Sequence, residues 1–280
     1  MKRRDQGYAM LAAIVGIAAF SYVAFEVIAE NRGIVSSVQG ENEHANLMAA
    51  ADAGLALAVN GLASTDKRNQ WTIDGSPRNA MFDDVALTIT IEDERGKIPL
   101  NGINEDQVRA MFAAAGATTS ELDTLVDSYE DWIDPDDDRR ANGAELQYYA
   151  PFGYGPRNSP FHSIGELRLL KGMNDSILER VAPAVTVFFG ESGGFSEGTA
   201  QILALQALEE LPPKAPRILD RMKQLQGLEP APDVANPPSL IGRTLRVQIE
   251  ARRAGAYAKR SAIVELTGNA ANPFWIREAD

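Results

Sequence analysis

The chain begins with a short basic segment that is followed by a long apolar one. Residues 8–25, YAMLAAIVGIAAFSYVAF, contain no charged side chain over eighteen positions. Because an α-helix rises about 1.5 Å per residue, such a helix nearly crosses the ~30 Å hydrocarbon core of a bilayer. Lys2, Arg3 and Arg4 precede it, and basic residues at this place keep the N-terminus in the cytoplasm. The sequence therefore predicts a membrane-spanning helix over 8–25, with the rest of the chain on the far side of the membrane.

Three kinds of N-terminal segment share this order of basic and apolar residues. A secretory signal peptide would be cut after the apolar stretch, and residues 27–29 before Glu30 form a passable small-residue cleavage site. A signal anchor would stay uncut. A prepilin-type leader, here residues 1–7, would be cut between Gly7 and Tyr8, so that the apolar helix remains on the mature protein.

The residues after the apolar stretch favour the prepilin route. Apolar side chains recur there at mostly three- and four-residue steps, which is the period of an amphipathic helix. They are Ile34, Val38, Ala45, Met48, Ala51, Leu55, Ala58 and Leu62. One long helix, half in lipid and half packed on a globular head, is the architecture of pilins, whereas a signal peptide does not need this continuity. The alternative is two helices with a break near Gly33 or Gly40.

The remainder of the chain changes from strand patterns to helix patterns and back. The strand candidates are 85–91, 245–249, 257–266 and 274–276. Helical spacing predicts a block of helices between the first and second of these strands. We therefore predict an α+β fold, in which a pilin-like long N-terminal helix packs on a small antiparallel sheet and a large α-helical domain is inserted between strands.

These patterns divide the chain into six segments. Seven of the fifteen prolines lie within 212–238, which predicts a connector there. The predicted segments are a leader at 1–7, the transmembrane part of the N-terminal helix at 8–25, the helix stem with the first strands at 26–98, the inserted α-helical domain at 99–211, the Pro-rich connector at 212–238 and the C-terminal strands at 239–280.

Composition narrows the chemistry that the chain can perform. It has no cysteine, so disulfides, thiol nucleophiles and cysteine zinc sites are excluded. It has two histidines, His44 and His162, and neither stands in a pattern that predicts a histidine-based catalytic triad. We therefore expect a protein that is not an enzyme. The net charge of −12 disfavours a broad nucleic-acid surface, because an acidic protein repels phosphates.

Acidic residues are concentrated in one loop, where four carboxylates lie within the five positions 134–138. Counted from Asp134, carboxylates occupy loop positions 1, 3, 5 and 12, which is the spacing of oxygen ligands in calcium-binding loops. Position 6 is Arg139, where an EF-hand needs glycine, so the loop is not an EF-hand. We predict a hard-cation site, for calcium before magnesium, whose ligands are Asp134, Asp136, Asp138 and Glu145. The alternative is a solvated loop that pairs with Arg139 and Arg140.

A second motif lies at 163–173, where a helical pattern, a short glycine hairpin and another helix follow one another. Many helix-hairpin-helix modules of this kind bind DNA phosphates through hairpin N–H groups and lysines. This hairpin has one lysine, Lys171, and carries Asp175 where a phosphate would lie. The sequence therefore favours a compact packing unit. A membrane-anchored DNA-binding protein of DNA uptake is the alternative function.

In combination these motifs resemble one family, the general secretion pathway protein K family of minor pseudopilins. The resemblance covers nearly the whole chain. It rests on the leader ending at Gly7, the following apolar helix, the Asp93-Glu94-x-Gly96-Lys97 turn leading to Asn101, the Asp131-Trp132 acidic loop, Gly143-Ala144-Glu145 with Tyr148-Tyr149, and Glu166-Leu167 with Gly172.

The resemblance implies a function in assembly. Members of the family initiate or cap a type II secretion pseudopilus at its tip, together with the I and J minor pseudopilins, for the export of folded proteins across the outer membrane. The major pseudopilin, prepilin peptidase and inner-membrane lipid are further implied partners, and nucleic acid is not. The resemblance implies cleavage between Gly7 and Tyr8, methylation of the new N-terminus, and a single pass through the bacterial inner membrane with the bulk of the chain periplasmic. It also implies calcium in the helical domain, which we assign to the four carboxylates named above.

Overall fold

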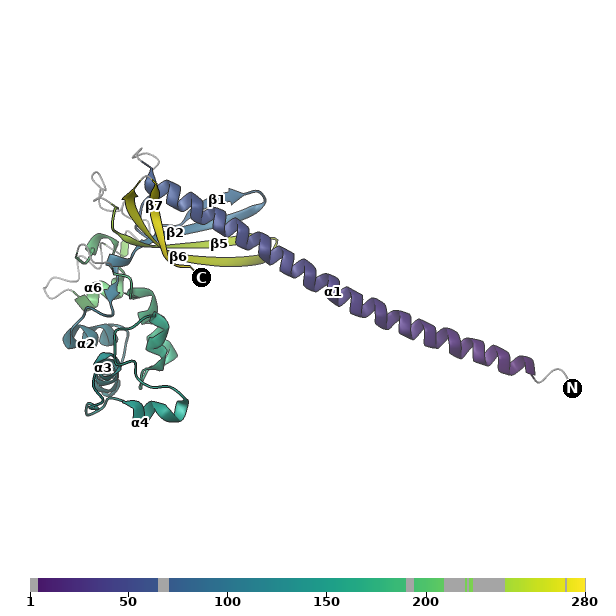
Figure 1. The fold of residues 1–280 in the computed structure, drawn as a ribbon, viewed down its shortest axis with the longest axis horizontal. Helices are drawn as coiled ribbons and strands as arrows, with labels where there is room; N and C mark the ends of the chain where they lie inside the picture. The colour runs from purple at the N-terminus through teal and green to yellow at the C-terminus, as the bar shows by residue number, and fades with distance from the viewer. Residues whose placement is uncertain are drawn as a thin grey trace.

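The fold is built on one long helix (Figure 1). The computed structural model describes residues 5–64, 71–189, 194–208, 220, 222–223, 240–269 and 271–279. Helix α1, Asp5–Ala63, has 59 residues and is therefore about 90 Å long. It runs through Gly33 and Gly40 without a break, so the prediction of one continuous helix is confirmed.

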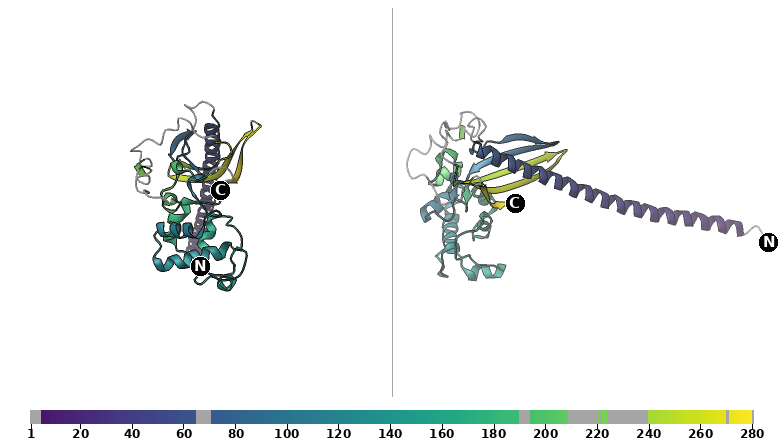
Figure 2. Two further views of the ribbon diagram at one scale, coloured as in Figure 1. Left: turned by 90° about the vertical axis from the view of Figure 1, so that its left-hand side faces the viewer. Right: turned by 45° about the horizontal axis from the view of Figure 1, so that its top comes forward.

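The C-terminal half of α1 packs on a five-stranded antiparallel sheet, as Figure 2 shows from two further sides. The strands are β1 (Arg78–Phe82), β2 (Val85–Asp93), β5 (Thr244–Arg253), β6 (Ala256–Asn269) and β7 (Asn272–Ala279), in the order β1-β2-β5-β6-β7. Strands β2 and β5 are neighbours, with Ile89 paired to Ile249, although the helical domain separates them in sequence. That domain is thus inserted between adjacent strands, and the predicted fold is confirmed.

The core of this head lies between α1 and the sheet. Small side chains on α1 let the helix approach the strands closely, and Ala51 and Ala58 are fully buried there. Facing them are the inward side chains of the strands, among them Leu87, Ile89 and Val247. Within the described residues one stretch, Val38–Ala63, has the length and hydropathy of a membrane span, but 44% of its window is buried. Its apolar character therefore belongs to the core of the head.

The predicted membrane span at 8–25 lies in the helical backbone of α1, which extends far beyond the head in Figure 1. Some of its side chains lie outside the described residues. Among those described, Ile14, Ile17 and Phe20 are exposed, Phe20 to 80%. Within the described residues, the N-terminal part of α1 is thus a candidate membrane anchor that extends from a folded head.

The inserted domain consists of short helices with one small parallel strand pair. Its α-helices are α2 (Glu105–Ala114), α3 (Thr119–Ile133), α4 (Leu146–Tyr149), α5 (Asp175–Val181) and α6 (Ile202–Leu208). Its 3₁₀ turns are η1 (Glu94–Gly96), η2 (Ala150–Phe152), η3 (Ile164–Leu169), η4 (Ala182–Ala184) and η5 (Glu197–Thr199). Strand β3 (Ile98–Pro99) pairs with β4 (Val185–Thr186). The connector predicted at 212–238 lies almost entirely outside the described residues.

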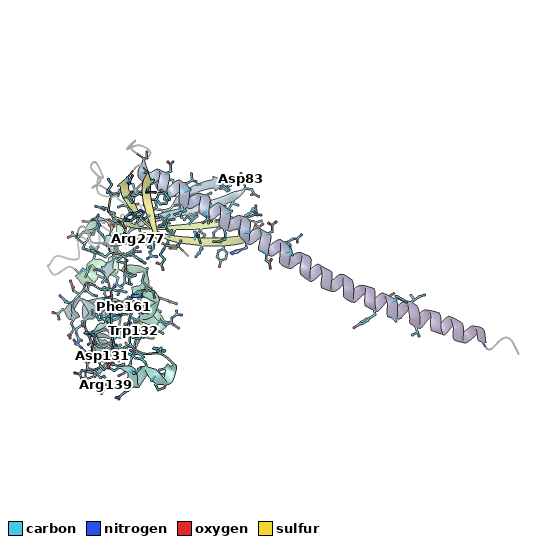
Figure 3. All side chains as sticks on the ribbon, viewed as in Figure 1. Asp83, Asp131, Trp132, Arg139, Phe161 and Arg277 are labelled. Atoms are coloured by element: carbon cyan, nitrogen blue, oxygen red, sulfur yellow. The ribbon has the colours of Figure 1, made fainter. Side chains whose placement is uncertain are left out.

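An aromatic cluster forms the centre of the helical domain, where Figure 3 labels Trp132 and Phe161. Their rings stack with centroids 6.5 Å apart, and Trp132 meets Tyr149 edge-on at 5.4 Å. Tyr129, also fully buried, contacts Phe161 and donates its hydroxyl hydrogen bond to the carbonyl of Leu100. This core is separate from the one beneath α1.

A buried charged cluster joins the helical domain to the sheet. Glu94, in η1, is fully buried and accepts hydrogen bonds from Lys97 Nζ at 2.8 Å and Arg246 Nε at 3.0 Å. It also accepts one from the hydroxyl of Thr186 on β4. Next to it, Asp93 pairs with Arg243 at 2.7 Å. The turn expected at 92–97 is therefore the junction at which β2, β4 and β5 meet.

The charges in this cluster stabilise one another. Burial by itself raises the pKa of Glu94, but Lys97 and Arg246 outweigh it, so its pKa lies below the ordinary value. Gly96 allows η5 to pack on the junction, since a Cβ there would come within 2.5 Å of the carbonyl oxygen of Thr199. The Asp93-Glu94-x-Gly96-Lys97 motif is thus required by packing and by charge pairing.

Candidate functional site in the acidic loop of the helical domain

The acidic loop connects the end of α3 to the start of α4. Asp131, in the last turn of α3, is fully buried, and Glu145, the residue before α4, is 4% exposed. Asp136, Asp137 and Asp138 lie between them and are exposed. Figure 3 shows Asp131 and Arg139 near the end of the helical domain that lies away from the sheet.

Asp131 organises the backbone of the loop. Both of its carboxylate oxygens accept from the N–H of Arg140 at 3.2 Å, and the N–H of Ala144 is a further donor. A Cβ at Gly143 would come within 2.0 Å of Asp131 Oδ2, so this close wrap requires glycine. From the other side, Lys171 Nζ donates to the carbonyls of Asn142 and Gly143 at 2.8 and 3.0 Å.

Inside this wrap lie carboxylate oxygens without a hydrogen-bond donor. Both carboxylate oxygens of Glu145 and Oδ1 of Asp134 are buried and have no partner among the described residues. Burial, with the charges of Asp131 and Asp134 next, raises the pKa of Glu145 to about 7. Buried polar atoms nearly always have a hydrogen-bond partner. These unpartnered carboxylate oxygens are therefore available to coordinate a cation.

The predicted ligands divide into two groups. The pKa of Asp134 is raised by burial and then by the charges of Asp136 and Asp131, which places it with Glu145 in one acidic cluster. Asp136 Oδ1 instead accepts from the N–H of Asp138 at 2.9 Å, and both of these residues face solvent. In the described part of the chain, no three carboxylate or histidine side chains already form a metal-binding group. Asp131 was missed as a member of the cluster because it lies before the counted loop.

Arg140, one of the two arginines of the loop, makes its ion pairs with residues outside the loop. Arg140 pairs with Glu105 at 2.9 Å and approaches Glu130 at 3.8 Å, both outside the loop. In the described part of the chain, the alternative of a loop that pairs with Arg139 and Arg140 is therefore not seen as an ion pair, although the charge of Arg140 acts to lower the pKa of Asp131 and Asp134. The loop from 131 to 145 has six acidic and two basic residues, a net charge of −4.

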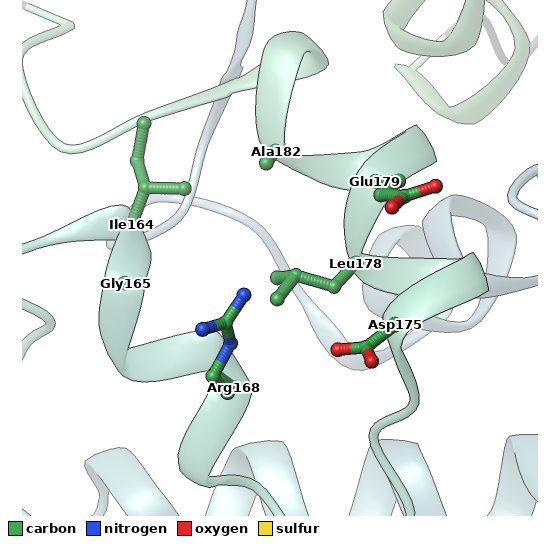
Figure 4. A pocket seen from close by; sticks show the side chains of 7 residues that line it. All are labelled: Ile164, Gly165, Arg168, Asp175, Leu178, Glu179 and Ala182. Carbon is green, nitrogen blue, oxygen red and sulfur yellow. The ribbon is translucent and has the colours of Figure 1, made fainter.

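The helix-hairpin-helix motif is used for packing. Its lysine, Lys171, donates a hydrogen bond to the backbone of the acidic loop. Asn174 caps α5 by accepting from the N–H of Ile177 at 3.0 Å. Figure 4 shows a cavity between η3 and α5, of about 650 Å³, into which Arg168 projects opposite Asp175 and Leu178. With carboxylates on one wall and apolar side chains on another, this cavity is a poor phosphate site. DNA binding is therefore not favoured.

Gly7 and Tyr8, the predicted cleavage pair, lie in the helical backbone near the start of α1, and their side chains lie outside the described residues. Among the described residues, the features that remain for recognition by other proteins are the stem, the sheet and the helical domain.

Several known proteins are similar to this chain in sequence. The family model for type II secretion system protein K matches residues 89–190, which include the charged junction and the acidic loop. The type II secretion system protein K of Klebsiella pneumoniae is 27% identical over 225 residues, 72% of this chain and 68% of that protein. A putative type II secretion system protein K of Escherichia coli K12 is 37% identical over 81 residues, 28% of this chain and 24% of that protein.

The likeness extends to the fold. A chain in the crystal structure of the GspK-GspI-GspJ complex of the enterotoxigenic Escherichia coli type 2 secretion system matches with a TM-score of 0.61. The match covers 88% of this chain and 98% of that chain at 15% identity, so it concerns the arrangement of elements. Together with the sequence matches, it shows that the chain is similar to type II secretion system protein K over residues 89–190 and that it shares the fold of a chain of the GspK-GspI-GspJ complex.

Proposed function

We propose that this chain assembles with I- and J-type minor pseudopilins and initiates or caps the tip of a type II secretion pseudopilus. The observation that carries the proposal is the match of the whole fold to a chain of the GspK-GspI-GspJ complex. The chain would act through helix packing and head-to-head contact, without catalysis. The major pseudopilin would then lie beneath it in the fibre.

The shape of the molecule supports a terminal position. The helical domain lies beyond the sheet, at the end of α1 away from the N-terminus (Figure 1). In a repeating fibre, a domain of this size at that end of α1 would obstruct the next subunit. We expect gold particles bound to a tag on the helical domain to label pseudopili once, at one end. Labels spaced along the fibre would contradict the proposal.

We also propose that prepilin peptidase cuts the chain between Gly7 and Tyr8, and that the new N-terminus is methylated in the inner membrane, with the bulk of the chain in the periplasm. Mass spectrometry of the protein from native membranes is expected to show a methylated chain beginning at Tyr8. The variant Gly7→Leu should keep its leader, while Gly16→Leu, whose added Cβ meets no atom within 4 Å, should still be cut. A chain that begins at Glu30, or that still carries Met1, would refute this route.

For the acidic loop we propose a structural calcium ion. The donors that fit it are the unpartnered oxygens of Asp134 and Glu145, with Asp136 and Asp138 as the predicted exposed ligands. Calcium prefers clustered carboxylate oxygens, and its charge would relieve their mutual repulsion. By linking the end of α3 to the start of α4, the ion would brace the outer end of the helical domain.

The effect of Glu145→Gln on the stability of the chain is expected to depend on whether calcium is present. At a calcium concentration a hundred times the Kd, binding adds about 2.7 kcal/mol to the free energy of unfolding, so chelation should lower the melting temperature. Glu145→Gln should abolish most of this gain. In chelator, however, the variant should be at least as stable as the parent, because a neutral amide is cheaper to bury beside Asp131 and Asp134 than a carboxylate.

The matched control is Asp123→Asn, which removes an exposed carboxylate of the same domain that pairs with Arg109 at 2.8 Å. Its response to calcium should equal that of the parent. Titration calorimetry of the full chain measures the binding directly. Calcium binding that is undiminished in Asp134→Asn with Glu145→Gln, or no binding in the parent, would dismiss the site.

A further inference from the structure

Three exposed apolar side chains come from one short stretch at the outer end of the helical domain. We call Leu146, Tyr148 and Phe152 the tip patch; they come from α4 and η2 and are 56%, 40% and 63% exposed. The rings of Tyr148 and Phe152 are 5.7 Å apart, and Tyr154 continues the cluster 6.2 Å from Phe152. In Figure 1, α4 lies at the end of the domain away from the sheet. The tip patch therefore contains a continuous group of rings and lies at the end of the domain away from the sheet.

The tip patch is held in place by the core beneath it. Tyr148 packs edge-on against the fully buried Tyr149 at 5.1 Å, and Tyr149 in turn contacts Trp132. Lys171 Nζ lies 5.4 Å from the Tyr148 ring centre. Single exposed apolar residues are ordinary, but a fixed group of large ones marks a surface that binds a partner. Tyr149, not the tip patch, closes the core, so packing alone does not account for these exposed side chains.

The tip patch follows the acidic loop directly in the sequence, and Lys171 is the cation that contacts its Tyr148 ring. The patch begins at the residue after Glu145, and Asn158 on the same side donates to Asp137 Oδ1 at 3.0 Å. In the described ranges, no lysine or arginine nitrogen lies within 4.0 Å of the carboxylates of Asp136, Asp137 or Asp138. The loop carries −4, and a bound divalent cation would leave −2. Negative charge remains beside the tip patch in either state.

We propose that the tip patch, with the adjacent acidic loop, is a docking surface for a basic protein segment that carries an apolar or aromatic side chain. The apolar side chain would lie on Phe152 and Leu146, and lysine or arginine side chains would approach Asp136–Asp138. Aromatic anchors surrounded by complementary charge are the usual composition of a binding hot spot. The same negative charge would repel anionic lipid and nucleic acid. This surface is separate from the stem and the sheet.

The test uses the full chain in nanodiscs of zwitterionic lipid and a labelled peptide that alternates lysine with leucine or phenylalanine. Fluorescence anisotropy, corrected with empty nanodiscs, should show binding that weakens with salt and exceeds that of a matching glutamate peptide. The variant Phe152→Ser with Leu146→Ser should bind at least about tenfold more weakly, which is the effect of losing one hot-spot anchor.

Two control variants make the outcome decisive. Tyr257→Ser removes a side chain that is 62% exposed, but on β6 of the head, and it should leave peptide binding unchanged. Asp137→Asn with Asp138→Asn should weaken binding of the lysine peptide while the tip patch stays intact. Equal binding by parent and tip-patch variant, equal binding of the lysine and glutamate peptides, or no binding would overturn the proposal. None of these outcomes bears on assembly with the other minor pseudopilins, which is assayed separately.

Discussion

Replacing Glu94 with glutamine is expected to lower the free energy of unfolding by about 3–5 kcal/mol, which is the usual cost of removing one partner from a buried ion pair. The amide would leave the charge of Arg246 without its carboxylate, whereas Lys97 would keep Glu92 at 2.9 Å. Chemical unfolding of the full chain, followed by circular dichroism, measures the loss.

The control for this variant is again Asp123→Asn. That exposed pair with Arg109, whose side chains are 56% and 41% exposed, should contribute less than about 1 kcal/mol. If the two variants are equally stable, the junction is not held by charge. The parent should also lose stability in acid. The pKa of Glu94 is depressed, so its contribution is present above the unfolded pKa of about 4.3 and disappears as the pH falls through the lower folded value.

The second large effect is expected from Trp132→Ala, at about 3–5 kcal/mol. The side chain is 2% exposed and contacts Phe161, Tyr149 and Tyr154, so its removal leaves a cavity at the centre of the helical domain. Trp132→Phe keeps a ring in the stack and should cost clearly less, although it loses the hydrogen bond from Nε1 to Glu166 at 3.4 Å.

Trp275→Ala is the matched control, because this tryptophan lies on the edge strand β7 and is 53% exposed. It should change the free energy of unfolding by less than about 1 kcal/mol. Differential scanning calorimetry suits these variants, since it does not depend on tryptophan as a probe. Hydrogen exchange should locate the loss from Trp132→Ala in α3 and α4 and leave the sheet protected. Loss that is spread evenly over both cores would argue against two separate cores.

The elements that the sequence could predict are those in which buried and exposed residues alternate regularly. Strand β2 alternates strictly between buried and less buried positions, and α3 has the apolar spacing of a helix, so both are visible in the sequence. Strand β1 is not, because it is an edge strand with no fully buried residue. Strands β3 and β4 have two residues each and pair in parallel across the domain, which no local pattern reveals. The helical pattern expected near 164–170, at the start of the 163–173 motif, is a 3₁₀ helix over Ile164–Leu169.

The sequence could predict only those parts of the candidate site whose residues lie close together along the chain. Spacing along the loop brought Asp134 and Glu145 into the prediction, and the structure places both at its buried side. It could not reveal Asp131, whose role depends on Gly143 wrapping back over it, or Lys171, which reaches the loop from the next module. The charged junction at Glu94 could not be predicted for the same reason. Arg246 is 152 residues away in sequence, and the two residues meet only because the sheet has formed.

The pairing of β2 with β5 also imposes an order on biogenesis. Chains are made from the N-terminus, and domains generally fold as units as they emerge. The helical domain has its own core and can close once residues up to Leu208 are present. The sheet must wait for β5 to β7, and until then the face of α1 that carries Leu47 and Ala51 remains uncovered. Addition of β5 to β7 is therefore the last step of folding. Before that step, the uncovered face of α1 is accessible to a chaperone or a neighbouring subunit.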